Sequence, residues 1–269
     1  MIEAALARFD AVEDGPEWAS MAGTVMPVRV GERPAVLKLM SVDFPQQVIA
    51  LREYDGRGAA ALIDVDAELQ ALLLERLEPG TSALELMRTD DDAATLVVAQ
   101  VAQALLRPAP VECGLPTYSD WAAAVTRTEP GEISSAHLGR AASLFRELAT
   151  EHTHLLHGDL HHDNVLRDGD GWRAIDPAGV LGEPAAECGA LLRNWLPDLL
   201  ELPDPVATTH RRVAILAEAL DLDAARIRAW AYAQSVMSVC WMIEDGHEWL
   251  RPEGLECIDL LHTVWAQAG

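Results

Sequence analysis

The sequence predicts an α+β protein with two lobes, a small β-rich lobe at the N-terminus and a larger helical lobe after it. Stretches with strand-like apolar patterns are concentrated in the first 78 residues, and longer stretches with helical periodicity follow. Glu78-Pro79-Gly80 interrupts both patterns, so we expect the lobes to span residues 1–78 and 79–269. A chain of 269 residues has room for two such lobes, but not for three ordinary domains.

The first region is expected to contain four strands and one helix. Strands at residues 22–30 and 34–40 would form a hairpin that turns at Gly31-Glu32-Arg33, and a helix would follow at 45–54. Further strands are expected at 59–65 and 69–77. The second of these is almost continuously apolar at residues 69–74, which favours a buried strand.

The second region is expected to be mainly helical. Thr89, followed by three aspartates, predicts the start of a helix that runs to about residue 106. Further helices are expected at 134–151, 223–244 and 253–266, and strands only at 164–167 and 172–176.

The bulk composition narrows the possible partners. A net charge of −23 argues against nucleic acid as a partner, because binding its phosphates requires clustered Lys and Arg. The charge is compatible with a cationic small-molecule substrate. An acidic surface can also serve solubility alone. No apolar run reaches the length of about 18 residues that a membrane helix needs. With no secretion signal and four scattered cysteines, we expect a cytoplasmic protein with reduced thiols.

The segment 157–166 with Ile175-Asp176-Pro177 carries the clearest chemical pattern. Asp168-Gly169-Asp170-Gly171 predicts a tight turn between two short strands. If Arg167 faces Trp172 across this turn, Asn164 lies opposite Ile175 and beside Asp176. An amide and a carboxylate oxygen would then meet at one end of the hairpin, where they could hold Mg²⁺.

Asp159 precedes Asn164 by five residues and is a candidate general base for an incoming hydroxyl. A base with an amide and a carboxylate for Mg²⁺ is the set that phosphoryl transfer from a nucleotide requires. Each short motif alone would be an ordinary turn or strand end, but their combination favours catalysis. The nearby histidines offer zinc as an alternative, although no defined ligand spacing supports it: His152, His154, His157, His161 and His162.

Lys38 is the only lysine among twenty Lys and Arg residues, and it lies in an apolar strand. A strand lysine can simply extend its ammonium group to solvent. Because this chain uses arginine elsewhere, we interpret Lys38 as a ligand for nucleotide phosphates, where its compact ammonium group fits.

Together these residues resemble the aminoglycoside phosphotransferase family, whose members have the protein-kinase-like fold. The resemblance implies that Asp159 is the base, that Asn164 and Asp176 bind Mg²⁺, and that Lys38 contacts the phosphates of ATP, with GTP also possible. The stretch 73–77 would form the hinge that receives the purine, with Glu75 and Leu77 as its nucleotide-binding residues. Residues 54–60, 74–80 and 176–184 are similar to the branch of streptomycin 6-kinase and hydroxyurea kinase.

Two features depart from that pattern. The branch usually has a glutamate near residue 47 to pair with the strand lysine, but this chain has Gln46-Gln47, and the nearest acid on the expected helix is Glu53. The loop expected to cover the phosphates is also poor in glycine, with only Gly23 before Thr24.

Three functions follow as expectations. The first is an ATP-dependent kinase of a streptomycin-like aminoglycoside. The second keeps this chemistry with hydroxyurea or another metabolite hydroxyl as acceptor, and the third is a non-catalytic remnant that binds nucleotide or antibiotic. A group of acidic residues beside two tryptophans could bind cationic groups or form an ordinary solvated face: Glu244, Asp245 and Glu248, with Trp241 and Trp249. The sequence does not indicate the oligomeric state.

Overall fold

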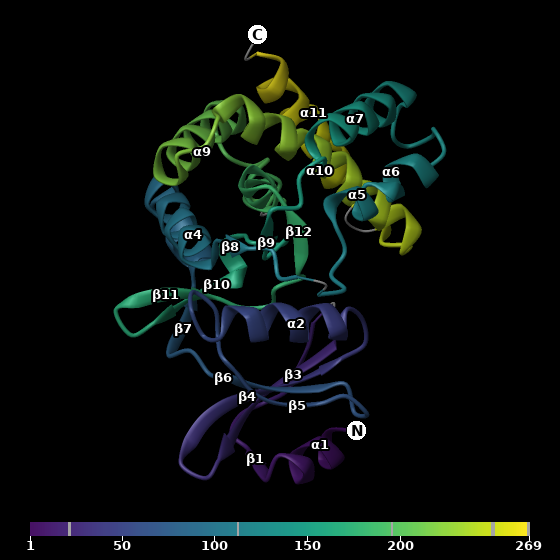
Figure 1. Ribbon diagram of the computed structural model, residues 1–269. Helices are drawn as coiled ribbons and strands as arrows, with labels where there is room; N and C mark the ends of the chain where they lie inside the picture. The colour runs from purple at the N-terminus through teal and green to yellow at the C-terminus, as the bar shows by residue number, and fades with distance from the viewer. Residues whose placement is uncertain (21–22, 112, 195, 249–250, 268–269) are drawn as a thin grey trace.

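The computed structural model describes residues 1–20, 23–111, 113–194, 196–248 and 251–267, and it has two lobes (Figure 1). The small lobe contains an antiparallel sheet of order β1-β3-β4-β6-β5, with β2 paired to β3. Its elements are α1 (Ile2–Arg8), β1 (Ala11–Glu13), β2 (Trp18–Ser20), β3 (Gly23–Val30), β4 (Arg33–Met40), α2 (Phe44–Tyr54), β5 (Leu62–Asp66) and β6 (Ala71–Glu75). The expected strands and helix are therefore present; residue 22, the expected start of the first strand, lies outside the described residues.

Helices cover both faces of this sheet, which explains why its central strands are apolar on both sides. Leu37 and Leu39 of β4 pack with α1, whereas Met40 packs with α2. Since successive side chains of a strand point to opposite faces, Lys38 shares the α2 face with Met40. Figure 1 shows that α2 lies on the side of the sheet that faces the large lobe. The alternation in β4 therefore directs the lysine toward the interface between the lobes.

The large lobe is built mainly from helices around α10, whose side chains Trp230, Tyr232 and Val236 are fully buried. Its helical elements are α3 (Ala83–Met87), α4 (Asp91–Leu105), α5 (Tyr118–Trp121), α6 (Ala123–Arg127), α7 (Ser135–Leu148), η1 (His162–Asn164), η2 (Pro184–Glu187), α8 (Cys188–Leu192), α9 (Pro205–Leu220), α10 (Ala224–Glu244) and α11 (Arg251–Ala266). Asp90, rather than Thr89, caps α4, because its carboxylate accepts the backbone N–H of Ala93. In the described part of the chain, no helix is both long and apolar enough to cross a membrane.

Short strands form two three-stranded sheets beside these helices. Their elements are β7 (Pro79–Ser82), β8 (Arg107–Pro108), β9 (His154–Leu156), β10 (Val165–Asp168), β11 (Gly171–Ala174) and β12 (Val180–Gly182), in the orders β11-β10-β7 and β12-β9-β8. The expectation of only two strands in this region was wrong. Segments of two to four residues are too short to show a period of two, so tertiary pairing alone reveals them.

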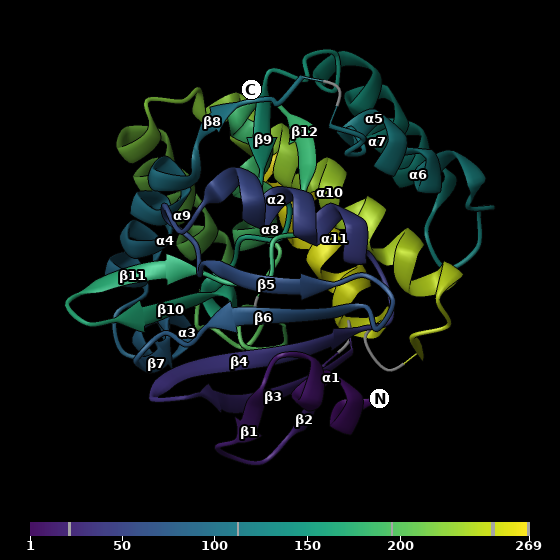
Figure 2. The same ribbon diagram turned by 60° about the horizontal axis from the view of Figure 1, so that its bottom comes forward.

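The β10–β11 hairpin links the two lobes. Figure 2 shows it beside β5 and β6 of the small lobe. The amide of Ala60 donates to Ala174 O at 2.9 Å, and the amide of Ala174 donates to Gly58 O at 2.8 Å. The segment after the hairpin, which contains Asp176, is thereby held at the junction of the lobes.

Candidate active site

The segment from His157 to Asn164 joins β9 to the β10–β11 hairpin and is called the catalytic loop below. Its sharp turn at Gly158 requires glycine, because φ is +82° and a Cβ atom would lie 2.8 Å from both Trp121 and Val180. The next residue, Asp159, is thereby directed away from the core toward the junction of the lobes.

His157 connects this loop to the end of the hairpin. Its ring is fully buried, with Nε2 2.7 Å from Ile175 O, while Nδ1 accepts the amide of Asp159 at 3.3 Å. These partners require a neutral ring with its proton on Nε2, and burial lowers the pKa of His157 to about 4. The uncharged ring thus fixes Asp159 relative to Ile175 and its neighbour Asp176.

Glu187 supports the same loop, a role that the sequence did not predict. Its carboxylate accepts the amides of His157 at 2.7 Å and Gly158 at 3.0 Å. Burial raises the pKa of Glu187 to about 7, although these hydrogen bonds work in the opposite direction. A glutamate eleven residues after Asp176 belongs to no motif that we recognised, so only the fold reveals this role.

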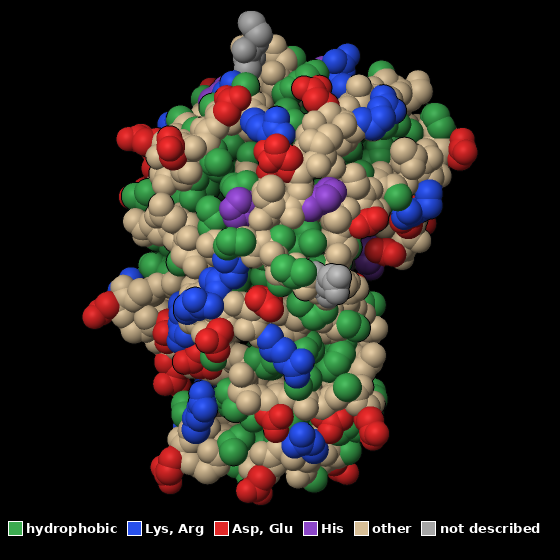
Figure 3. Space-filling view, in the orientation of Figure 1, with side chains coloured by type: hydrophobic (Ala, Val, Ile, Leu, Met, Phe, Trp, Pro, Cys, Tyr) green, Lys and Arg blue, Asp and Glu red, His purple; other side chains and the backbone are tan. Residues whose placement is uncertain are grey.

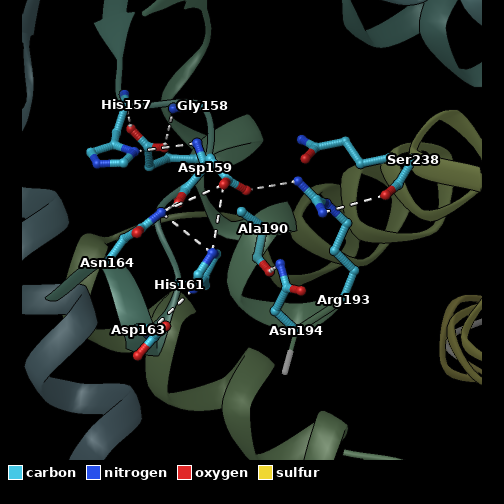
Figure 4. A network of polar contacts seen from close by, with 12 residues as sticks. His157, Gly158, Asp159, His161, Asp163, Asn164, Ala190, Arg193, Asn194 and Ser238 are labelled. Atoms are coloured by element: carbon cyan, nitrogen blue, oxygen red, sulfur yellow. Dashed lines mark hydrogen bonds and ion pairs between the residues drawn. The ribbon is translucent and has the colours of Figure 1, made fainter. Parts of the chain in front are cut away.

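Asp159 lies at the centre of a polar network that converges from three elements (Figure 4). Its Oδ1 accepts Arg193 Nη2 at 3.1 Å, while Oδ2 lies 3.5 Å from both His161 Nε2 and Asn164 Nδ2. The side chain is 41% exposed, so one side of the carboxylate remains accessible. Burial of the group would raise the pKa of Asp159, but His161 and Arg193 outweigh it and hold this pKa well below its usual range.

The hairpin register confirms the geometry expected from its turn. Arg167 pairs with Trp172, and the amide of Ile175 donates to Asn164 O at 2.9 Å, which brings Asn164 next to Asp176. The Asn164 amide nitrogen donates to Asp159 O at 2.9 Å, so any ligand role falls to its oxygen. Asp176 has a left-handed backbone with φ of +58°.

These oxygens fit Mg²⁺, which accepts few protein ligands and takes the remainder from phosphates and water. Among the described residues, no group of three or more His, Cys, Asp or Glu side chains is placed to hold a metal ion. The His157 ring is hydrogen-bonded to the backbone, and the ring of His162 is fully buried.

Lys38 reaches this site from the small lobe. Its ammonium group lies 2.8 Å from Asp176 Oδ1, and its side chain is 1% exposed. Glu53, the acid expected nearby on α2, is exposed, whereas Gln47 is buried and donates to Pro177 O at 3.3 Å. The lysine thus pairs with a carboxylate of the hairpin segment rather than with α2.

The two residues expected to contact the nucleotide base lie at the end of β6 and just beyond it. The Glu75 carboxylate accepts Arg173 Nη1 at 2.8 Å, and the Glu75 amide donates to Ala61 O at 2.9 Å. The Leu77 side chain is buried. Their contact with a purine stays a prediction.

The acidic residues at the end of α10 are less suited to bind a cation than their sequence suggests. Glu244 forms a two-pronged ion pair with Arg127, at 3.0 and 2.9 Å, and Glu248 lies 3.8 Å from Arg251. Trp249 lies outside the described residues.

This fold, with Lys38, the Asn164–Asp176 pair and the Asp159 carboxylate at the junction of two lobes, defines the class of phosphotransferases with the protein-kinase-like fold. A thermostable mutant of aminoglycoside phosphotransferase APH(4)-Ia, solved with ADP and hygromycin B, superposes with a TM-score of 0.72 at 17% identity, over 99% of this chain and 98% of that one. The profile described as aminoglycoside/hydroxyurea antibiotic resistance kinase matches residues 8–246, and the chain belongs to this family.

Three curated relatives have similar sequences. Streptomycin 6-kinase of Streptomyces glaucescens is 32% identical, over 94% of this chain and 85% of the relative. Streptomycin 3''-kinase of Klebsiella pneumoniae is 32% identical over 89% and 91%, and hydroxyurea phosphotransferase of Kitasatospora aureofaciens is 33% identical over 86% and 69%.

Proposed function

We propose that this chain is an ATP-dependent O-phosphotransferase that phosphorylates a hydroxyl of a streptomycin-like aminoglycoside and thereby confers resistance. The observation that carries the proposal is the convergence of Asp159, Asn164, Asp176 and Lys38 where the lobes meet. ATP is the expected phosphoryl donor, with GTP as the other candidate. The proposal assigns the reaction to the cytoplasm, where the donor is available.

In this mechanism Asp159 accepts a hydrogen bond from the acceptor hydroxyl and later its proton. Because Arg193 and His161 lower its pKa, the carboxylate is a weak base that orients the hydroxyl more than it deprotonates it. Such a base is sufficient for a loose phosphoryl-transfer transition state, which needs little nucleophilic assistance. Lys38 would contact the nucleotide phosphates, and Asn164 and Asp176 would hold Mg²⁺, which would supply positive charge to offset that of the phosphates.

The choice of acceptor is supported by the relatives and by charge. Two of the three relatives reported above are named streptomycin kinases, and they act at different hydroxyls, 6 and 3''. A net charge of −23 favours the approach of a polycationic antibiotic. Hydroxyurea is the second candidate, because a relative of similar identity is named for it.

The first experiment is mass spectrometry of streptomycin, other aminoglycosides and hydroxyurea after incubation with protein, ATP and Mg²⁺. We expect phosphate on streptomycin. Asp159→Asn should lower turnover by about 10²–10⁴-fold, because the neutral amide cannot take the proton and holds the hydroxyl less strongly than the carboxylate does. Turnover of Asp159→Asn within a few-fold of wild type would refute the mechanism. Faster phosphorylation of hydroxyurea would select the second candidate, and a wild-type protein without Mg²⁺-dependent nucleotide binding would be a remnant.

A further inference from the structure

Asp176 lies between two backbone carbonyl groups that are each held by a buried side chain. On one side, His157 Nε2 lies 2.7 Å from Ile175 O. On the other, Gln47 Nε2 donates to Pro177 O at 3.3 Å, and the Gln47 side chain is 4% exposed. The first anchor belongs to the large lobe and the second to α2 of the small lobe.

The same segment packs directly on α2 just beyond Pro177. A Cβ atom on Gly179 would lie 2.9 Å from Gln46 O and 3.2 Å from Ala50 Cβ, so the two backbones are in close contact there. Asp176 has φ of +58°, a backbone conformation that persists only where the surrounding structure holds it. The direction of its carboxylate therefore depends on how both neighbouring residues are held. That carboxylate lies 2.8 Å from the Lys38 ammonium group.

We infer that Gln47 is a positioning residue, whose amide fixes the Asp176 segment to α2 and so aims the metal-binding carboxylate at the site shared with Lys38. This inference rests on the proposed function, since it assigns Mg²⁺ to Asp176. Gln47 is then not a poor substitute for the glutamate that the branch usually has near this position; it has a role of its own. A carboxylate at position 47 has no hydrogen to donate to Pro177 O, and it would place an unpaired negative charge at a buried position.

Two variants of Gln47 with similar side-chain length separate these interpretations. Gln47→Met removes the donor without adding charge, and Gln47→Glu replaces the donor by a carboxylate. Gln46→Met, at the half-buried neighbour, is the matched control because the amide that donates to Pro177 O is that of Gln47. Binding of Mn²⁺ in the presence of ADP, followed by electron paramagnetic resonance, reports the metal site without turnover. Thermal melting by circular dichroism checks that each variant folds.

We expect Gln47→Met to raise the dissociation constant of Mn²⁺ by about fivefold to tenfold, the effect of one lost buried hydrogen bond. Gln47→Glu should weaken binding at least as much, while Gln46→Met stays within about twofold of wild type. Mn²⁺ binding in Gln47→Glu as tight as in wild type, or tighter, would overturn the inference, as would unchanged binding in Gln47→Met. If wild type itself bound no Mn²⁺ with ADP, the proposed function would fail, and the inference with it.

Discussion

His162, three residues after Asp159, is fully buried, and neither of its ring nitrogens has a hydrogen-bond partner among the described residues. One nitrogen must carry a proton, and burial of an unpartnered donor costs about 1–3 kcal/mol. We therefore expect His162→Leu to raise the free energy of unfolding by about 1 kcal/mol at neutral pH, measured by urea denaturation. His157→Leu, at a ring with two hydrogen bonds, should instead lower it.

The pH dependence of this effect has a definite sign. Burial holds the pKa of His162 well below its ordinary value of 6.5. Between this lowered pKa and pH 6.5, the unfolded chain therefore binds a proton that the folded chain does not. Wild type should lose stability as pH falls through this range, and His162→Leu should lose less. If His162→Leu raised the free energy of unfolding by the same amount at every pH, this explanation would be contradicted.

For Glu187 we expect the opposite dependence of stability on pH. Its folded pKa of about 7 exceeds the ordinary value of 4.5, so its contribution to stability is fully present below pH 4.5 and is lost as pH rises through 7. Compared with Glu187→Gln, wild type should lose about 3 kcal/mol of relative stability between pH 4.5 and 8, measured by urea denaturation in a pH series. A constant difference between the two proteins would show that the carboxyl group does not titrate there.

At the scale of elements, the β10–β11 hairpin is joined to the small lobe by Arg173. This side chain bonds Glu75 of β6 at 2.8 Å and Asp168 of its own hairpin at 2.6 Å, and all three side chains are less than one third exposed. The hairpin also positions Asn164 and Asp176, so the Arg173 bridge couples the lobes next to the proposed metal site.

We expect Arg173→Met to lower the free energy of unfolding by about 1–3 kcal/mol, because it leaves two partly buried carboxylates without their cation. It should also raise KM for the nucleotide, measured by steady-state kinetics. Arg167→Met is the control, since among the described residues Arg167 hydrogen-bonds only Gly169 O within its own turn and stacks on Trp172. Equal losses in both variants would show that the bridge to Glu75 has no special role.

At the scale of the whole molecule, the net charge of −23 is spread widely on the visible face. In Figure 3, acidic side chains lie on both lobes among Lys and Arg side chains and form no single acidic patch there. On this face, a long-range field rather than a local cluster would attract a cationic acceptor. Because salt screens such fields, kcat/KM for streptomycin should fall about tenfold between about 0.05 and 0.5 M NaCl, whereas kcat/KM for neutral hydroxyurea should not.

We also propose that the two lobes divide between residues 78 and 79. Just beyond this point the chain enters β7, which pairs with β10 of the hairpin. The division would allow the lobes to move relative to each other around the links formed by Lys38, Gln47 and Arg173. The KM of Arg173→Met for the nucleotide also tests this proposal, because this variant lacks one of these links.

The spacing of Asp159, Asn164 and Asp176, with the family that it resembles, indicated the kinase-like class. The sequence by itself also determined the strand that carries Lys38, the long helices α4, α7, α10 and α11, and the hairpin register that brings Asn164 to Asp176, whereas α9 was not predicted. These features depend on local periodicity, caps and turn residues, all of which act within a few positions along the chain. Only the tertiary structure decided the short strands, the support of the catalytic loop by Glu187, and the pairing of Arg193 with Asp159. It also assigned Lys38 to Asp176 and Gln47 to Pro177. These contacts join residues far apart in sequence, and their partners depend on how the lobes pack, which no local pattern encodes.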